Sequence, residues 1–198
     1  YPWLTLRAST MPVQLLVAPA WPLVRSGNAG VRLAEAVNSC GQFMGNPLWE
    51  FSLATYRVAG VAESCLALQD QIGLDVNQLL YAAWLARNNQ CLSEAHLAEL
   101  DGLVAEWRAA VIQPLRGLRR QLQGYSQATS VREELKALEL KAEQAQQDMM
   151  YAFYQRSEEL LRGDNPLLAN LTRVALQANP NRDQWDDAIR GLASVIAS

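Results

Sequence analysis

Apolar side chains recur at intervals of three and four residues from about residue 44 onwards, which is the period of an amphipathic helix. Asn46 followed by Pro47 marks a helix start, because an asparagine side chain caps the first turn and proline suits the first helical position. The sequence lacks the two-residue alternation that is typical of strands. We therefore predict an all-α fold, a helical bundle of about six or seven helices with one long heptad-patterned helix.

The apolar spacing also predicts where these helices begin and end. They should span about 47–59, 61–72, 76–88, 94–123, 130–162, 166–178 and 182–197. Asp75 should cap the third helix, which is apolar nearly all round and should therefore lie centrally in the fold. Pro114 stands inside the fourth helix and predicts a kink or a break just before it.

The helix expected at 130–162 has the clearest pattern. Ser130 followed by Glu133 is typical of a capping box at its start. Six residues then alternate spacings of four and three, as in a heptad seam: Val131, Leu135, Leu138, Ala142, Ala145 and Met149. Two interpretations are open, because this seam could pack inside the chain's own bundle or could contact a second subunit or a partner protein.

Residues 1–43 differ in character from the rest of the chain. They contain four prolines and no sustained apolar period, so we predict an irregular N-terminal extension. A single helical domain is expected over 44–198. Met44 is a plausible native start, and on that hypothesis residues 1–43 do not belong to the native protein.

Composition narrows the function classes. Half of the residues are hydrophobic and 19% are charged, which is typical of a globular protein. The net charge of -3 argues against broad coating of nucleic acid, so such a partner is not favoured. Three cysteines without a CxxC motif favour a reducing compartment. No apolar run is long enough to cross a membrane.

Several short blocks together resemble a known family. They are LWEFSL at 48–53, GVA at 60–62, CLALQD at 65–70 and GLDVN at 73–77, followed further on by WR at 107–108 and PLR at 114–116. The combined pattern, over about residues 46–145, is similar to small uncharacterised proteobacterial proteins that form a domain of unknown function. The resemblance implies a cytoplasmic bacterial protein and supports Met44 as the start, but it transfers no catalytic role.

A group of arginines is the first candidate site. Its members fall on the predicted fourth helix and at the start of the fifth: Arg108, Arg116, Arg119, Arg120 and Arg132. Guanidinium groups suit bidentate contact with phosphate or carboxylate, so RNA phosphate or an acidic partner is one hypothesis. The alternative is ordinary solvation with intramolecular pairs to Glu106, Glu133 and Glu134.

A second candidate is a polar pocket near Asp75, Asn77 and Trp84. A polar side chain buried beside the apolar third helix would need hydrogen-bond partners. These residues could line a site for a small molecule or an enzyme's substrate, although capping of the helix explains Asp75 equally well.

The remaining candidates are weaker. His96 is the only histidine, and a lone histidine early in a helix is expected at the surface or partly buried. Asp183 and Asp187 have the spacing of a magnesium-diphosphate motif, with Glu139 and Glu143 as its only possible counterpart, yet both pairs are expected on solvated helix faces. We predict no cofactor and no metal. The leading hypothesis is a non-enzymatic helical interaction or adaptor-type protein.

Overall fold

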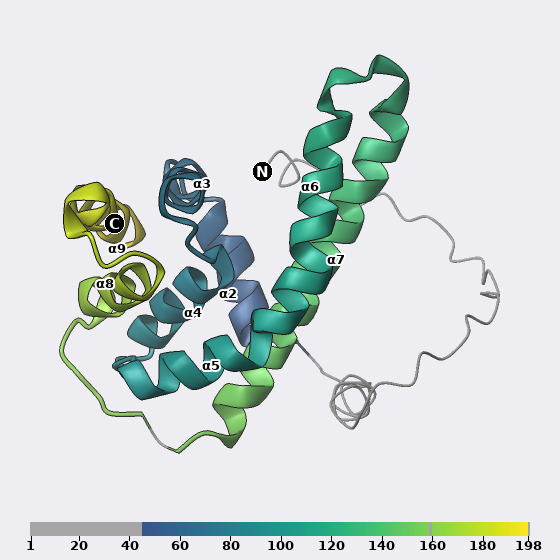
Figure 1. Ribbon diagram of the computed structural model, residues 1–198. Coiled ribbons are helices and arrows are strands. Elements are labelled where there is room, and N and C mark those ends of the chain that lie inside the picture. Colours follow the sequence, from purple (N-terminus) through teal and green to yellow (C-terminus); the bar gives the residue numbers. More distant parts are fainter. Residues whose placement is uncertain (1–44, 159, 198) are drawn as a thin grey trace. The chain divides into compact units, whose positions relative to one another are not determined.

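The computed structural model describes residues 45–158 and 160–197, and this part of the chain is mostly helical and contains no strand (Figure 1). The prediction of an all-α bundle is confirmed. The α-helices are α2 (Pro47–Tyr56), α3 (Val61–Ile72), α4 (Val76–Arg87), α5 (Glu94–Trp107), α6 (Gln113–Gln121), α7 (Thr129–Arg156), α8 (Leu167–Ala178) and α9 (Asp186–Ala197). The predictions on residues 1–43 lie outside the described residues.

Helix α4 forms the centre of the fold, as its apolar sequence predicts. Every residue from 76 to 86 is buried, and the helix packs against α2, α7 and α8. Its start is fixed by Asp75, whose Oδ1 accepts the Asn77 backbone N–H at 2.9 Å. Asn46 caps α2 in the same way, accepting the backbone N–H of Leu48 at 2.9 Å.

The break predicted at Pro114 takes the form of a π-helical turn. The segment η2 (Arg108–Ile112) lies between α5 and α6, so the chain continues without a loop but with one wider turn. Proline has no N–H to donate, and its ring collides with the carbonyl four residues earlier in a regular helix. A wider turn relieves that collision, and it places Arg108 at the junction.

Helix α7 differs from its prediction at both ends. It begins at Thr129, no side chain caps it, and Ser130 lies inside the helix, so the predicted capping box is wrong. It ends at Arg156 rather than near 162. Residues beyond it pair instead with the α4–α5 connection, where the Cys91 N–H donates to the Leu161 carbonyl at 2.7 Å. This tertiary pairing outcompetes continuation of the helix.

Helix α8 begins one residue later than an Asn-Pro start would require. Pro166 occupies the capping position and Asn165 has a φ of +48°, so the helix starts at Leu167 and not at the predicted residue 166. Asn170 instead anchors the helix, because its buried side chain accepts the Leu92 N–H and donates to the carbonyl oxygens of Ala82 and Gln90.

Helices α6 and α7 run side by side in opposite directions, and their linked ends extend beyond the other helices (Figure 1). We call residues 113–142 the arm. None of the helices within 45–158 and 160–197 combines the length and the apolar character that a membrane span requires.

Candidate functional site

The inner face of α7 is polar, although it is buried. Glu139, Glu143, Gln146 and Gln147 follow one another at helical spacing, and they are 3%, 6%, 0% and 1% exposed. Burying a carboxylate costs on the order of several kcal/mol unless nearby charge and hydrogen bonds compensate for the lost hydration. The partners of these four side chains therefore define the chemistry of this region.

Arg116 on α6 compensates the two glutamates. Its Nε donates to Glu139 at 3.1 Å and its Nη2 to Glu143 at 2.9 Å, while Nη1 donates to the Gln69 side chain of α3 at 2.8 Å. Arg119, one turn further along α6, also donates to Glu139. One guanidinium thus joins α3, α6 and α7.

Arg108, in the π-helical turn, forms a second ion-pair group. Its Nη1 donates to Asp75 at 2.9 Å and its Nη2 to Asp101 at 2.8 Å. Burial alone would lower the pKa of Arg108, but the two carboxylates raise it above its ordinary value. Gln78 donates to the same oxygen of Asp101 at 2.7 Å, which holds this carboxylate in place.

Side-chain amides extend the Arg108 group toward α2. Gln146 donates to Asp75 at 2.7 Å and accepts from Asn77 at 3.3 Å. Asn77 in turn accepts from Gln147 at 2.9 Å, and Gln147 accepts from the Ser52 hydroxyl at 2.9 Å. The Arg108 group therefore extends as one continuous network from α2 to the π-helical turn, while Arg116, Arg119, Glu139 and Glu143 form a second buried group beside it on α6 and α7.

The two ion-pair groups together contain more acids than bases. Their four carboxyl groups, Asp75, Asp101, Glu139 and Glu143, face three guanidinium groups, those of Arg108, Arg116 and Arg119. Burial raises the pKa of Glu143 to about 7, and neighbouring Glu139 adds to this effect against the opposing pull of Arg116. Protonation of Glu143 leaves three carboxylates facing three guanidinium groups.

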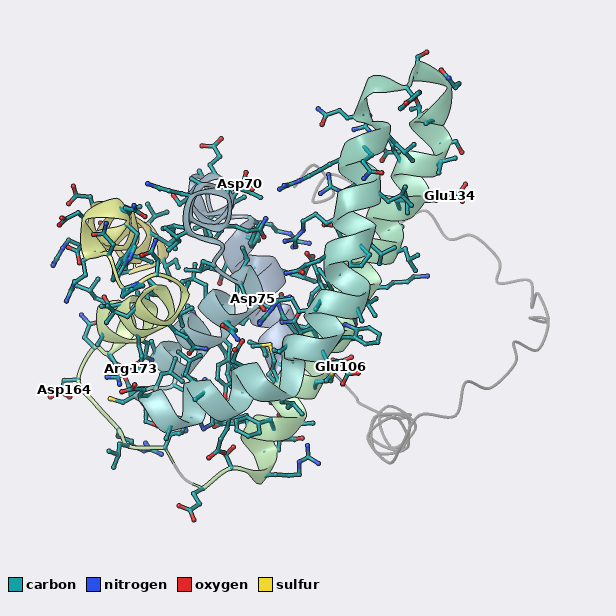
Figure 2. The ribbon with its side chains drawn as sticks, in the orientation of Figure 1. Asp70, Asp75, Glu106, Glu134, Asp164 and Arg173 are labelled. Carbon is teal, nitrogen blue, oxygen red and sulfur yellow. The ribbon has the colours of Figure 1, made fainter. Side chains whose placement is uncertain are left out.

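A solvent-facing cleft of about 450 Å³ opens beside this network. Figure 2 shows Asp75 in the region between α4 and the arm, among the side chains that line the cleft. The polar lining residues are Gln69, Asp70, Asp75, Asn77, Gln78, Asp101, Arg108, Gln113, Arg116, Arg120, Gln146 and Gln177. Three aspartates and three arginines are among them, so their formal charges cancel.

The structure brings together residues from both predicted sites. Asp75 and Asn77 from the predicted pocket line the same cleft as Arg108, Arg116 and Arg120 from the arginine group. The other predicted members do not line it. Arg119 lies behind the cleft on Glu139, and Arg132 lies in the first turns of α7.

Trp84 was predicted in the polar pocket, and this placement is wrong. Its ring lies in a separate aromatic cluster, edge-on to Tyr154 with 4.7 Å between the ring centroids and near Tyr151 at 5.9 Å. It lies on α4 two turns beyond Asn77, where it packs against the C-terminal part of α7.

The intramolecular pairing of the arginines is present, but with acids other than those predicted. Glu106, Glu133 and Glu134 were the expected partners; the observed partners include Asp70, which accepts from Arg120 at 2.9 Å. Glu133 pairs with Lys136 instead. Sequence distance misled the prediction, because all the actual partners except Asp101 are 20 to 50 residues away along the chain.

The two i, i+4 acid pairs have different environments. Asp183 and Asp187 are exposed, as predicted. Glu139 and Glu143 are buried, so their predicted solvated face is wrong. Within the described residues no three His, Cys, Asp or Glu side chains form a group that could hold a metal ion.

His96 is also more buried than predicted, at 8% exposed. Its Nε2 lies 2.6 Å from the Tyr81 hydroxyl, and its ring contacts Phe153. Burial lowers the pKa of His96 and raises that of Tyr81. This neutral pair is part of the aromatic core and is remote from the polar cleft.

Sequence analysis missed Asp101, Gln146 and Gln147. A signal for the glutamines exists, because Glu139, Glu143, Gln146 and Met150 share one helical face. The heptad pattern on the neighbouring face of the same helix obscured it. No sequence pattern marks Asp101, because its contact with Arg108 depends on the π-helical segment that orients Arg108 toward it.

Some residues of the predicted heptad seam are buried and others are exposed. Leu135 and Ala142 are 9% and 6% exposed, so they pack within the arm. Val131 and Leu138 are 49% and 51% exposed, and Leu118 of α6 is 45% exposed. We call Leu118, Val131 and Leu138 the outer apolar residues of the arm.

The fold and the cleft define an all-helical protein with a buried ion-pair network that is open to solvent along one edge. The chain belongs to the family described as "Protein of unknown function (DUF2390)", whose sequence model matches residues 47–150. This range extends from α2 through most of α7 and includes the whole ion-pair network. Neither the curated proteins nor the solved structures contain a significant match to the chain.

Proposed function

We propose that this protein binds a small hydrophilic molecule in the polar cleft. The observation that carries the proposal is the Asp75–Arg108–Asp101 group, which is held in place by Gln78 and Gln146 at the edge of a 450 Å³ cavity. Binding sites gain affinity when polar groups are positioned before the ligand arrives. The volume is within the range of small-molecule sites.

The lining indicates the kind of ligand. It contains no aromatic ring on which a nucleobase could stack, and its apolar members are few, chiefly Leu74 and Ile112. Arg108 and Arg116 each donate to two carboxylates of the chain, which disfavours phosphate or RNA as the ligand, because such a ligand would need several arginines at once. A molecule rich in hydrogen-bonding groups and poor in apolar surface matches these walls best.

Binding without covalent chemistry is favoured over catalysis. The side chains that line the cleft include no hydroxyl, thiol, imidazole or amine, and the nucleophilic groups among them are aspartate carboxylates that already pair with arginines. The acids at the cavity are Asp70, which pairs with Arg120, and Asp75 and Asp101, which Arg108 holds together. Their arrangement positions a ligand more readily than it transfers a proton.

Thermal unfolding of the full chain with a panel of small polar metabolites tests the proposal. A ligand that binds only the folded state should raise the Tm, by an amount that grows with its concentration. The exposed Gln113 lines the cleft, so Gln113→Trp should fill its mouth and abolish the shift. Gln121→Trp, an exposed position on the same helix that does not line the cleft, is the matched control. An equal shift in both variants would contradict the proposal.

Self-association through the arm is a second candidate, favoured by the outer apolar residues. Val131, Leu138 and Ala145 are seven residues apart and therefore lie along one line of α7. In an antiparallel pair with a two-fold axis near Leu138, Val131 would face the partner's Ala145. Exposed Glu134 would lie beside the partner's Lys141, which adds complementary charge. Figure 2 shows Glu134 on the side of α7 that points away from the other helices.

Sedimentation of the full chain measures this second function. A dimer is expected, and Leu138→Glu should convert it to a monomer, whereas Leu161→Glu, at a side chain 79% exposed outside the arm, should not. Glu134→Lys alone should weaken the dimer through repulsion from the partner's Lys141, and adding Lys141→Glu should restore it. A wild-type monomer at high concentration would end this proposal without affecting the cleft.

A further inference from the structure

The two ends of the cleft differ in charge. At one end Asp75 and Asp101 share the single guanidinium of Arg108, which leaves an excess of one negative charge. At the other end Arg116 and Arg120 face the cleft with one aspartate, Asp70. The lining is neutral as a whole, but it is polarised along its length.

Both ends retain hydrogen-bonding capacity. Asp101 accepts from Gln78 and from Arg108 through the same oxygen, Oδ1, so Oδ2 is left for a donor in the cleft. Its side chain is 32% exposed. The Arg120 side chain is 54% exposed and donates to Asp70 through Nη2, so its other N–H groups are left for an acceptor.

The glutamates behind the cleft preserve this polarity. Glu139 and Glu143 lie against Arg116 on the side away from solvent. Because the pKa of Glu143 is raised to about 7 by burial, this carboxyl keeps its proton in mildly acidic solution and does not cancel the second arginine. The end of the cleft at Arg116 and Arg120 then has an excess of one positive charge.

We infer that the ligand of the cleft is a small aliphatic zwitterion, with an ammonium group at Asp101 and a carboxylate at Arg120. This inference rests on the proposed function and names its ligand class. A ligand with only one charge would leave one end of the cleft without a partner, while an ammonium and a carboxylate in one molecule satisfy both ends. The shortage of apolar lining favours an unbranched chain with no large side group.

Calorimetric titration of the full chain at pH 6 and low salt tests the inference. The probes are unbranched ω-amino acids from glycine to 6-aminohexanoate, with an alkylamine and a carboxylate of matched length for each. One length of the series should bind at least about tenfold more tightly than its amine and its acid, because only it spans both ends. The optimal length then reports the separation between Asp101 and Arg120.

Variants assign the two charges. Asp101→Asn should weaken the best amino acid by about tenfold and leave the matched carboxylate unchanged; Arg120→Gln should weaken the amino acid similarly and leave the matched amine unchanged. Asp183→Asn, at an exposed site outside the cleft, is the control. Circular dichroism of each variant confirms that it is folded.

The outcomes separate the two proposals. Binding of the amines or the acids as tight as that of the amino acids would overturn the zwitterion. A metabolite panel that raises the Tm while no ω-amino acid binds would overturn the zwitterion and retain the polar cleft as a binding site. A chain that responds to neither set would overturn both.

Discussion

The two sides of α7 reverse the usual distribution of side chains. On the inner side Glu139 and Glu143 are 3% and 6% exposed, whereas on the outer side Val131 and Leu138 are about half exposed. Helices normally bury their apolar face. The difference shows that arginines of α6 determine what α7 can bury, because Arg116 and Arg119 supply charges that make burial of carboxylates tolerable.

Helix α4 gives the contrasting case within the same molecule. All of its residues from 76 to 86 are buried, and most of them are aliphatic or aromatic. Apolar burial stabilises this centre, at about 25 cal/mol per Å². The arm depends more on its ion pairs, so the stability effect of a substitution there should depend on the charge of the side chain more than on its size.

The largest expected effect comes from Arg116→Met. Removing this guanidinium leaves Glu139 and Glu143 buried with one partner fewer, and breaking a buried pair costs about 3–5 kcal/mol. Urea denaturation measures the loss of unfolding free energy. Arg120→Met is the matched control, because its pair with Asp70 is exposed and is worth less than about 1 kcal/mol. Equal effects in the two variants would contradict a structural role of the inner network.

Glu143→Gln should remove a pH dependence. The folded-state pKa of Glu143 is about 7 and its ordinary value is 4.5, so between these values the folded chain binds more protons than the unfolded chain. The contribution of this group to stability therefore falls as pH rises from about 4.5 to about 7, by up to about 3 kcal/mol. The variant, which keeps a neutral acceptor for Arg116, should be more stable than the wild type at pH 8. Denaturation midpoints measured from pH 5 to pH 8 should become flatter in the variant, and an unchanged slope would refute the assignment.

Leu135→Ala and Leu138→Ala compare the two apolar lines of α7. Leu135 is 9% exposed, so its truncation should cost about 2 kcal/mol, at the low end for a buried leucine. Leu138 is 51% exposed, and its truncation should change monomer stability by less than about 0.5 kcal/mol. The measurement is chemical denaturation at a concentration below any self-association. A larger loss of stability for Leu138→Ala than for Leu135→Ala would mean that the outer apolar residues of the arm are covered in the folded monomer.

The smallest effect is expected at the Asp186 cluster on α9. Arg182 and Arg190 lower the pKa of Asp186, but all three groups are near solvent. Asp186→Asn should therefore change stability only slightly, and added salt should remove the difference. A loss comparable to that of Arg116→Met would remove the distinction between surface and buried ion pairs.

Local signals were sufficient for most of the fold. The Asp75 cap, the span of α3 and the interruption before Pro114 follow from residues close in sequence, and all three are confirmed. The end of α7 could not be predicted, because it depends on backbone pairing of Leu161 with the distant Cys91.

The site was predictable in part. Asp75, Asn77 and three of the arginines were identified as candidates, and the structure places them around one cleft. Their convergence depends on how α4 and α6 meet, which the sequence does not state. The buried glutamates were misplaced because a charged residue at helical spacing is usually solvated, and only contact with Arg116 reverses this expectation.

The cleft's role as a binding site is tested most directly by nuclear magnetic resonance of the full chain, titrated with the polar metabolite that gives the largest Tm shift. Gln78, Gln113 and Gln146 line the cleft, and the signals of their side-chain amides can be followed individually. The account predicts that these three signals move together with the ligand concentration, while that of Gln121 on the arm stays in place. Saturable binding that leaves the three signals unchanged would contradict it.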